Sequence, residues 1–379
     1  MRVSRSFLMA AALLVLLHFY IGSRLLPDLA LSTLGWTIGV AVLAASCLLM
    51  PLSMMTRSSR RQPLADRIAW AGMIMMGLFS SLLVLTLLRD IVLLAALALP
   101  SQSSAVPHAS AIAVVVMALS ATLIGFINAR RRARVVEVDI PIADLPPDLQ
   151  GFSIVQISDV HVGPTIKRGY VDAIVSAAND LDADVIAITG DLVDGSVSQL
   201  AEDVRPLADL TARHGVYFVT GNHEYYSDAP AWTRELRRLG LRVLSNEHVV
   251  LRKRNSAVVV AGVTDFGAHH FDPQQRSDPA VALNGAPTQV DVKILLAHQP
   301  RSASAAAAAG FDLQLSGHTH GGQFWPWNLF VPLQQPFTAG LHRLNQLWVY
   351  VSRGTGYWGP PKRFGAPSEI TRIRLVAQN

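Results

Sequence analysis

The sequence predicts two structural parts, a bundle of transmembrane helices followed by an α/β domain with a parallel β-sheet. Hydrophobic residues make up 51% of the 379 residues and charged residues only 16%, and the apolar excess lies in four runs before residue 130. After residue 150, short apolar strand patterns alternate with helix-like stretches, as in βαβ units. We therefore expect a membrane region at 1–129, a basic linker with a lead-in strand at 130–149, and an α/β domain at 150–379.

Four apolar runs are candidates for membrane-spanning helices, and they cover residues 7–22, 33–55, 68–88 and 109–129. A helix needs about 20 residues to cross the hydrocarbon core, which the last three runs provide. The first run fits either a retained span or a signal peptide, and we predict a span because no small-x-small cleavage site follows it. Arg89 and Asp90 end the third run, where we expect them at the headgroup boundary and not within the membrane.

The arginines predict the orientation of these spans. The N-terminal tail, the 56–67 loop and the 130–134 flank are basic, whereas the 100–108 loop carries no formal charge. Because cytoplasmic flanks are enriched in Lys and Arg, we expect a multi-pass inner (cytoplasmic) membrane protein with its C-terminal domain in the cytoplasm. We attribute the net charge of +5 and the pI near 9.6 to this topology signal. The expected partners are thus membrane lipids, and no nucleic acid is expected.

The α/β domain begins with three strand patterns at 152–158, 183–190 and 215–221, and helix-like stretches at 167–180 and 198–213 lie between them. Each strand pattern ends in polar residues, which are Asp159 and His161, then Asp191, then Asn222 and His223. Their spacing is that of one βα unit, so we expect them at the same edge of a sheet. In open α/β sheets this carboxyl edge is where ligands bind.

Two further strand patterns end in His298 and in the pair His318 and His320. Each of these groups alone fits a turn or a core histidine. Together, buried without partners, they would cost too much free energy, and a pair of divalent cations removes that cost. Imidazole, carboxylate and amide ligands suit Mn, Fe, Zn or Co. The one cysteine, Cys47, lies in an apolar run, which excludes an intrachain disulfide and a thiolate cluster.

The motifs DVH, GDLVD, GNHE, H and GHTH, in this order and spacing, resemble the five-motif signature of the calcineurin-like metallophosphoesterases. The apolar N-terminal region and the late segment SRGTGYWGPPKRFGAPSEIT are similar to the membrane-associated YkuE/YaeI-type phosphodiesterase branch. The resemblance implies a four-layer αββα sandwich and a dinuclear metal site. By motif position, it implies that the first metal is held by Asp159, His161 and His320, and the second by Asn222, His298 and His318, with Asp191 bridging and His223 acting in catalysis.

The function implied by the resemblance is that of a membrane-anchored, metal-dependent phosphohydrolase, most simply a phosphodiesterase. The resemblance also implies that a hydroxide bridging the two metals attacks the phosphorus of a phosphoester. Manganese is one candidate for these metals. One alternative is a pyrophosphatase that acts on a nucleotide-linked lipid precursor. Another is a non-catalytic metal-binding membrane scaffold, against which the complete ligand set and His223 argue.

Several other residues have more than one interpretation. The segment FWPWNLFVPLQQPF (324–337) fits an apolar wall for a lipid-like substrate, a membrane-surface contact, or a lid packed over the sheet, which we favour. Asp194 either orients a ligand or caps a helix, and Glu224 either bonds to His223 or faces solvent. Three residues near the C-terminus either contact the substrate phosphate or close the fold: Arg353, Tyr357 and Trp358.

Overall fold

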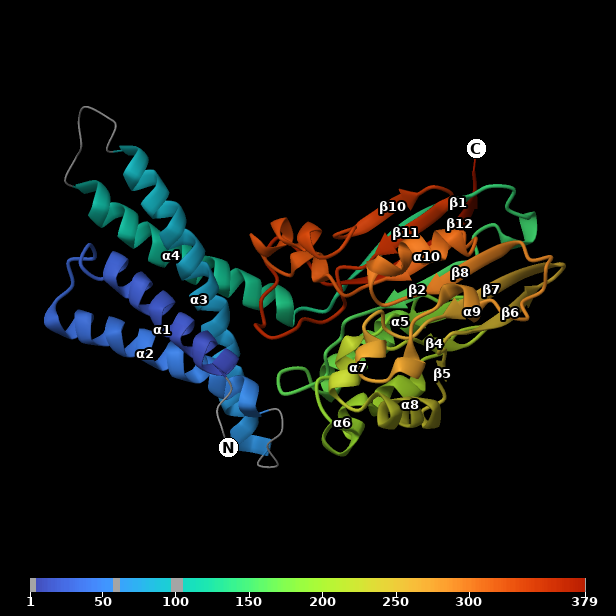
Figure 1. Cartoon of the computed structure of the whole chain (residues 1–379), viewed down its shortest axis with the longest axis horizontal. Coiled ribbons are helices and arrows are strands. Elements are labelled where there is room, and N and C mark those ends of the chain that lie inside the picture. The colour runs from blue at the N-terminus through green and yellow to red at the C-terminus, as the bar shows by residue number, and fades with distance from the viewer. Residues whose placement is uncertain (1–4, 57–61, 97–104, 379) are drawn as a thin grey trace. The chain divides into compact units, whose positions relative to one another are not determined.

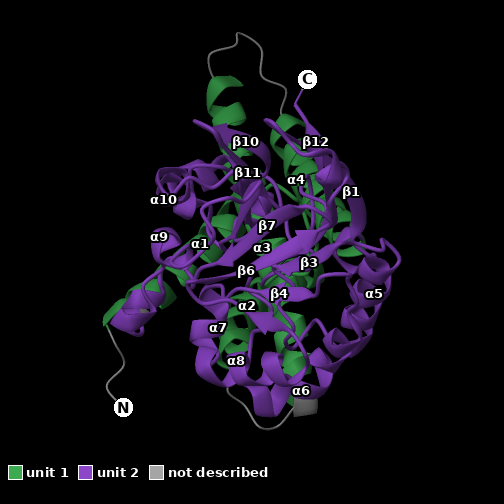
Figure 2. Ribbon diagram, turned by 90° about the vertical axis from the view of Figure 1, so that its right-hand side faces the viewer, with its two compact units in different colours: residues 1–127, 359–362 green, residues 128–358, 363–379 purple. Residues whose placement is uncertain are grey.

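The computed structural model describes residues 5–56, 62–96 and 105–378, which form two compact units (Figure 2). Unit 1 consists of Met1–Ile127 together with Gly359–Lys362, and unit 2 consists of Asn128–Trp358 together with Arg363–Asn379. The chain therefore leaves unit 2 for four residues near its C-terminal end and then returns to it. Arg2, Arg57, Arg60, Arg61 and the first part of the 100–108 loop, on which the orientation prediction partly rests, lie outside the described residues.

Unit 1 contains four long helices, each long and apolar enough to cross a membrane (Figure 1). They are α1 (Arg5–Leu25), α2 (Thr33–Met55), α3 (Gln62–Ala96) and α4 (Ala105–Arg130). The last three residues of α4 belong to unit 2. Four apolar helices were expected, and this part of the fold prediction is confirmed. The helix α3 is longer than the predicted run at both ends.

Arg89 and Asp90 lie in a charged cluster near the C-terminal end of α1. The Arg89 guanidinium pairs with Asp28, which follows α1 in the chain, and its Nη1 donates to the carbonyl of Arg24 at 2.9 Å. Asp90 accepts two hydrogen bonds from Arg24, at 2.8 and 3.0 Å, and one from the Tyr20 hydroxyl at 2.8 Å. Each charge is thus neutralised near the level where α1 ends. The position of this pair relative to a membrane stays a prediction.

Unit 2 is built on two six-stranded sheets. The first has the order β1-β12-β2-β3-β4-β5, and the second has the order β10-β11-β9-β8-β7-β6. The strands of the first sheet are β1 (Arg134–Ile142), β2 (Ser153–Ile157), β3 (Val185–Ile188), β4 (Val216–Phe218), β5 (Arg242–Val243) and β12 (Glu369–Ala377). Those of the second are β6 (Glu247–Lys253), β7 (Ser256–Gly262), β8 (Val292–Leu296), β9 (Leu313–Ser316), β10 (Gly340–Leu344) and β11 (Leu347–Val351).

Three apolar cores hold these layers together, because the central strands are apolar on both faces. In β2, Ile157 belongs to the core shared with the helices of the first sheet, whereas Ile154 belongs to the core between the two sheets. A third core joins Leu295 of β8 to Ala306 on the outer face of the second sheet. The helices are α5 (Arg168–Asn179), α6 (Val197–Val204) and α8 (Ala229–Arg238) on the first sheet, and α9 (Pro279–Ala282) and α10 (Ala303–Ala308) on the second. The predicted αββα sandwich is confirmed.

One predicted helix differs from the structure. The sequence pattern predicts a continuous helix at 198–213, but α6 ends at Val204 and a 3₁₀ turn, Arg205–Asp209, follows it. Pro206 explains the change, because proline has no N–H for the hydrogen bond of an α-helix and clashes with the preceding turn.

Parallel pairing brings the strand ends to one edge in each sheet. Ile157 at the end of β2 pairs with Ile188 of β3, which in turn pairs with Phe218 of β4. In the second sheet, Leu296 at the end of β8 pairs with Leu315 of β9. The residues that follow these five strands therefore leave the two sheets at matching levels, as the sequence spacing predicts.

Candidate metal centre

The backbone is unusual at five of the positions predicted to bind metal. Asp159, His161, Asp191, His318 and His320 all have positive φ, at 54°, 55°, 51°, 70° and 52°. A residue with a Cβ rarely adopts this left-handed conformation, which costs about 1–3 kcal/mol each. Residues of this kind cluster at functional sites, where the surrounding structure holds them against the strain. The turns after β2, β3 and β9 thus bend sharply at the polar residues.

A first group of candidate ligands joins the end of β2 to the end of β9. The Nε2 atoms of His161 and His320 lie 3.0 Å apart, and His320 Nε2 lies 3.5 Å from Asp159 Oδ1. Burial and the nearby Arg363 guanidinium lower the pKa of His320 well below its ordinary value. Its imidazole is therefore neutral at pH 7. Two imidazole nitrogens and a carboxylate oxygen at such distances are a donor set for a divalent cation.

A second group joins the ends of β3, β8 and β9. His298 Nε2 lies 3.1 Å from Asp191 Oδ2 and 3.1 Å from His318 Nδ1. The other nitrogen of His298, Nδ1, lies 2.7 Å from the carbonyl of Thr189. Because a carbonyl oxygen only accepts, this contact fixes the proton on Nδ1 and aims Nε2 at the other two groups. Burial and the positive charge of His298 lower the pKa of His318 to about 3, so His318 offers a free lone pair.

Asn222 adds an acceptor that lacks a donor. It is the first residue of the short helix α7 (Asn222–Tyr226), and its Oδ1 is buried and has no hydrogen-bond partner among the described residues. A buried acceptor of this kind costs about 1–3 kcal/mol unless something binds it. A divalent cation satisfies such an oxygen directly. Six of the predicted ligands thus lie in two groups that fit a divalent cation, and the Asn222 oxygen has the chemistry of a seventh ligand.

His223 is held by a carboxylate that the sequence reading ranked as a weaker candidate. Its Nδ1 lies 2.5 Å from Asp194 Oδ1, and its Nε2 lies 3.9 Å from Asp191 Oδ2. Burial lowers the pKa of His223, but the charges of Asp191 and Asp194 outweigh it and raise the value to about 9. The rings of Tyr226 and Trp358 flank the imidazole, with centroids 5.2 and 5.6 Å away. His223 is thus a positioned proton donor beside the candidate ligands.

Glu224 has a role that the sequence reading missed. Glu224 is fully buried, so it does not face solvent. Its carboxylate also does not bond to His223, but to the backbone. Its two oxygens accept from four backbone N–H groups, those of Gly221 at 2.6 Å, Leu192 at 2.7 Å, Asp191 at 3.0 Å and Val193 at 3.3 Å. One carboxylate thereby ties the turn after β3 to the turn after β4. Local sequence gives no signal for this, since three of the four donors lie more than 30 residues away.

Two glycines allow the turns to approach this closely. A Cβ at Gly221 would lie 2.2 Å from Asp191 Oδ1, and a Cβ at Gly317 would lie 2.1 Å from Asp159 Oδ2. Any side chain at either position would displace a candidate ligand. The glycines of the GNHE and GHTH motifs are therefore required by the space around the carboxylates.

Arg363 is a second residue that the sequence reading missed, although it lies in the late segment singled out there. It is buried, donates to the carbonyls of His320 at 3.0 Å and Arg353 at 2.7 Å, and places Nη2 3.0 Å from His320 Nδ1. Arg353 itself pairs with Glu369 at 3.0 Å. Tyr357 is buried and donates to the carbonyl of Thr165 at 3.3 Å, which closes the fold.

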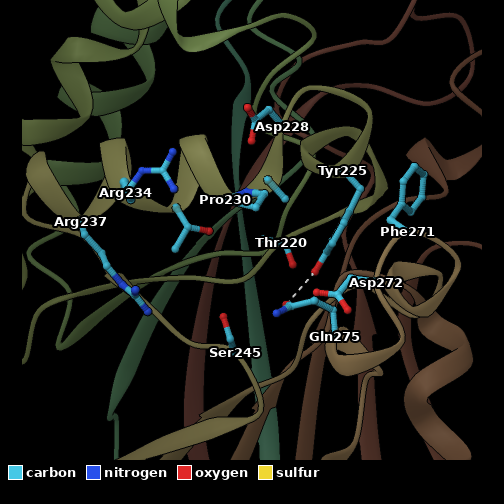
Figure 3. Close-up of a pocket in the computed structure, with 12 residues that line it drawn as sticks. Thr220, Tyr225, Asp228, Pro230, Arg234, Arg237, Ser245, Phe271, Asp272 and Gln275 are labelled. Carbon is cyan, nitrogen blue, oxygen red and sulfur yellow. Dashed lines mark hydrogen bonds between the residues drawn. The ribbon is translucent and has the colours of Figure 1, made fainter.

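A pocket of about 510 Å³ lies beside α7 and is separate in its lining from the candidate ligands (Figure 3). Tyr225 and Gln275 are hydrogen-bonded across it at 3.3 Å. Its charged lining residues carry both signs, and they are Asp228, Asp272, Arg234 and Arg237. None of the seven predicted metal ligands lines it, so the metal centre and this pocket are distinct features.

Comparison with known proteins agrees with the motif resemblance. Residues 152–322 match the family model described as calcineurin-like phosphoesterase. A "Transmembrane protein with metallophosphoesterase domain" from Danio rerio is 42% identical over 66% of this chain and 59% of its own length. An "Uncharacterized metallophosphoesterase" from Helicobacter pylori (strain ATCC 700392 / 26695) is 37% identical over 67% of each chain. The chain belongs to the calcineurin-like phosphoesterase family.

The prediction of the metallophosphoesterase family is thus confirmed. "Uncharacterized metallophosphoesterase YkuE" from Bacillus subtilis (strain 168) is 29% identical over 62% of this chain and 82% of its own length, which supports the predicted branch. The similarity to the Danio rerio protein, together with four apolar helices, supports membrane association. The chain spans about 60% of the length of the vertebrate relatives that it matches.

Proposed function

We propose that this protein is a membrane-anchored phosphodiesterase with a dinuclear metal centre. The observation that carries the proposal is the convergence of metal-ligand side chains in two neighbouring groups. His161 Nε2 lies 3.0 Å from His320 Nε2, and His298 Nε2 lies 3.1 Å from both His318 Nδ1 and Asp191 Oδ2. Each group offers imidazole and carboxylate atoms to one divalent cation. Two groups of this kind favour two cations.

The assignment of ligands follows the two groups. Asp159, His161 and His320 would hold one ion, and Asn222, His298 and His318 would hold the other, with Asp191 shared. Mn, Fe, Zn and Co all suit this set of nitrogen and oxygen atoms. When bound, two such ions supply Lewis acidity toward a phosphoryl group and lower the pKa of water to near neutrality.

The protein's own contribution to the reaction lies in His223. Asp194 accepts from its Nδ1 and fixes the direction of the ring, with Nε2 on the side of Asp191. A protonated imidazole beside the reacting phosphoester donates a proton to the departing oxygen.

A diester is favoured over a monoester by the charges around the centre. A phosphomonoester carries more negative charge than a diester and needs additional cations. Arg353 is committed to Glu369, and Arg363 is committed to backbone carbonyls and to the His320 ring. The aromatic neighbours of His223 instead suit a second organic substituent on the phosphate.

We place the metallophosphoesterase domain on the cytoplasmic side of the inner membrane, on the basis of the basic flank at 130–134. A green fluorescent protein fused after Asn379 tests this, because that protein fluoresces only when it folds in the cytoplasm. Fluorescent cells are expected. A dark fusion that becomes active when alkaline phosphatase replaces the fluorescent protein would place the domain on the other side.

The activity is tested with the full chain, stripped of metal in detergent. Methyl p-nitrophenyl phosphate serves as diester and p-nitrophenyl phosphate as monoester, each with Mn²⁺ added and then chelated. We expect Mn²⁺-dependent cleavage of the diester, and its loss in Asp191→Asn, which removes the shared carboxylate. Wild-type turnover in Asp191→Asn, or equal turnover without metal, would contradict the proposal.

A further inference from the structure

An exposed apolar segment follows the His318–His320 turn directly. It comprises the 3₁₀ turns η8 (Trp327–Leu329) and η9 (Val331–Leu333) with the residues around them. The exposed fractions are 43% for Trp325, 42% for Trp327, 64% for Leu329, 52% for Phe330 and 80% for Leu333. The favoured interpretation of this segment, a lid packed over the sheet, does not account for the exposure of these five side chains. We call these five side chains, together with the 39% exposed Trp358, the apolar rim.

The apolar rim is attached to the metal centre by specific contacts. The carboxamide of Gln323 donates to the carbonyl of Trp358 and accepts from its N–H, both at 2.9 Å. Trp358 in turn lies against His223. A Cβ at Gly322 would lie 2.3 Å from the backbone of Asn328, so η8 folds directly onto the turn that carries His320. The rim thus begins at the candidate catalytic histidine and extends outward.

The exposed apolar segment lies in a stretch of the chain without acidic residues. Residues 313–368 contain no Asp or Glu, so no carboxylate of this stretch opposes contact with an anionic surface. An exposed apolar patch of this kind is rare on a fully solvated protein and marks a contact with a partner. Tryptophan favours the membrane–water interface, where its ring is buried and its N–H stays hydrated.

The chain also joins the rim to the helix unit. Gly359–Lys362, which directly follow Trp358, belong to unit 1. There the Lys362 amino group donates to the carbonyl of Gly77 in α3 at 3.0 Å and also contacts Ser81. Because α3 is one of the four apolar helices, Trp358 is one peptide bond away from residues that are anchored on a candidate membrane span.

We propose that the apolar rim inserts into the bilayer interface and that the metal centre acts there on a phosphoester carried by a lipid. This inference rests on the proposed phosphodiesterase function and names the class of its substrate. A lipid phosphodiester at the interface presents its phosphate at the headgroup level and its chains to the apolar side. The rim would bind the chains while His223 and the candidate ligands meet the phosphate.

Insertion is tested with spin labels on the full chain in lipid nanodiscs that contain phosphatidylglycerol. Cys47→Ala removes the native thiol, and Leu329→Cys and Leu333→Cys each add one label in the rim. Arg254→Cys, at a side chain that is 80% exposed in the β6–β7 connection, is the control. We expect the rim labels to collide more with oxygen than with a water-soluble nickel chelate, and the control label to show the reverse. Rim labels that behave like the control would overturn the insertion.

Substrate class is tested with two diesters that share one leaving group. Hexadecyl p-nitrophenyl phosphate is supplied within the nanodisc, and methyl p-nitrophenyl phosphate is supplied in solution. In the double variant Leu329→Glu with Leu333→Glu, we expect turnover of the hexadecyl ester to fall by about tenfold or more, because two apolar contacts with the membrane are lost. Turnover of the methyl ester stays unchanged. Val281→Glu, at an exposed apolar side chain of α9 outside the rim, is the matched control and changes neither rate.

The outcomes separate the two proposals. If the wild-type protein cleaves neither ester in the presence of metal, the proposed phosphodiesterase function fails, while the label measurement still decides on insertion. If the wild-type protein cleaves both esters and the double variant slows neither, the function stands and the lipid inference is wrong.

Discussion

The substitution Gly221→Ala, which adds one methyl group beside Asp191, tests the geometry of the site most sensitively. This glycine precedes α7 with φ −99°, a conformation that alanine also adopts, so Gly221→Ala introduces no backbone strain of its own. The added Cβ would instead lie 2.2 Å from Asp191 Oδ1, whereas ordinary van der Waals contact begins at 3.4 Å. The carboxylate must therefore move by about 1 Å or more.

The size of the effect follows from what Asp191 contacts. Its Oδ1 accepts from the N–H of His223 at 2.9 Å, and its Oδ2 lies 3.1 Å from His298 Nε2. A shift of about 1 Å in a reacting group costs on the order of 100-fold in rate. Overpacking of a tight site costs about 1–3 kcal/mol of stability. We thus expect Gly221→Ala to fold, with reduced metal content and a turnover about 100-fold lower.

The matched control is Gly169→Ala in α5. A Cβ there has nothing within 4 Å, and the residue lies within a helix, so alanine should stabilise the protein by up to about 1 kcal/mol. Both variants are compared by turnover of methyl p-nitrophenyl phosphate, metal content by mass spectrometry, and thermal unfolding. Wild-type turnover and metal content in Gly221→Ala would refute the role assigned to Asp191.

Three further predictions concern the residues around the centre. Asp194→Asn keeps the shape of the side chain but removes the charge that holds His223, so turnover should fall about 10–100-fold with metal content retained; an unchanged rate would show that His223 needs no such partner. Glu224→Ala leaves four backbone N–H groups without their acceptor, so it should lower the free energy of unfolding by about 3 kcal/mol or more and reduce the melting temperature. The control Glu247→Ala, at an exposed side chain of β6, should have little effect on the melting temperature. Chelation of metal should lower the melting temperature of the wild-type protein, since ions at about 1,000 times their dissociation constant contribute about 4 kcal/mol; an identical melting temperature with and without metal would argue against tight binding.

The sequence predicts most of the fold because the central strands are apolar on both faces and end in polar motifs. Strands β2, β3 and β4 follow from this pattern, and so does the edge at which the polar residues gather. The end of α6 at Val204 was missed, although Pro206 carries the signal.

Local sequence gives no signal for other features of the site. Glu224 acts on backbone groups that belong mainly to another strand end, and Arg363 acts on the carbonyl of His320, 43 residues earlier. Contacts of this range depend on the tertiary fold. The exposure of apolar side chains between residues 325 and 333 was also not predictable, because an aromatic segment fits both a buried lid, which we favoured, and a membrane contact.

The most direct test of the dinuclear centre is the number of metal ions bound per chain. The full-length protein would be purified, loaded with Mn²⁺, freed of excess ion and analysed by mass spectrometry beside Asp191→Asn. Two ions per wild-type chain, with both occupancy and diester cleavage lost in the variant, are the predicted result. Fewer than two ions in a fully active wild-type protein, or two ions in Asp191→Asn with undiminished turnover, would contradict the shared-carboxylate centre proposed here.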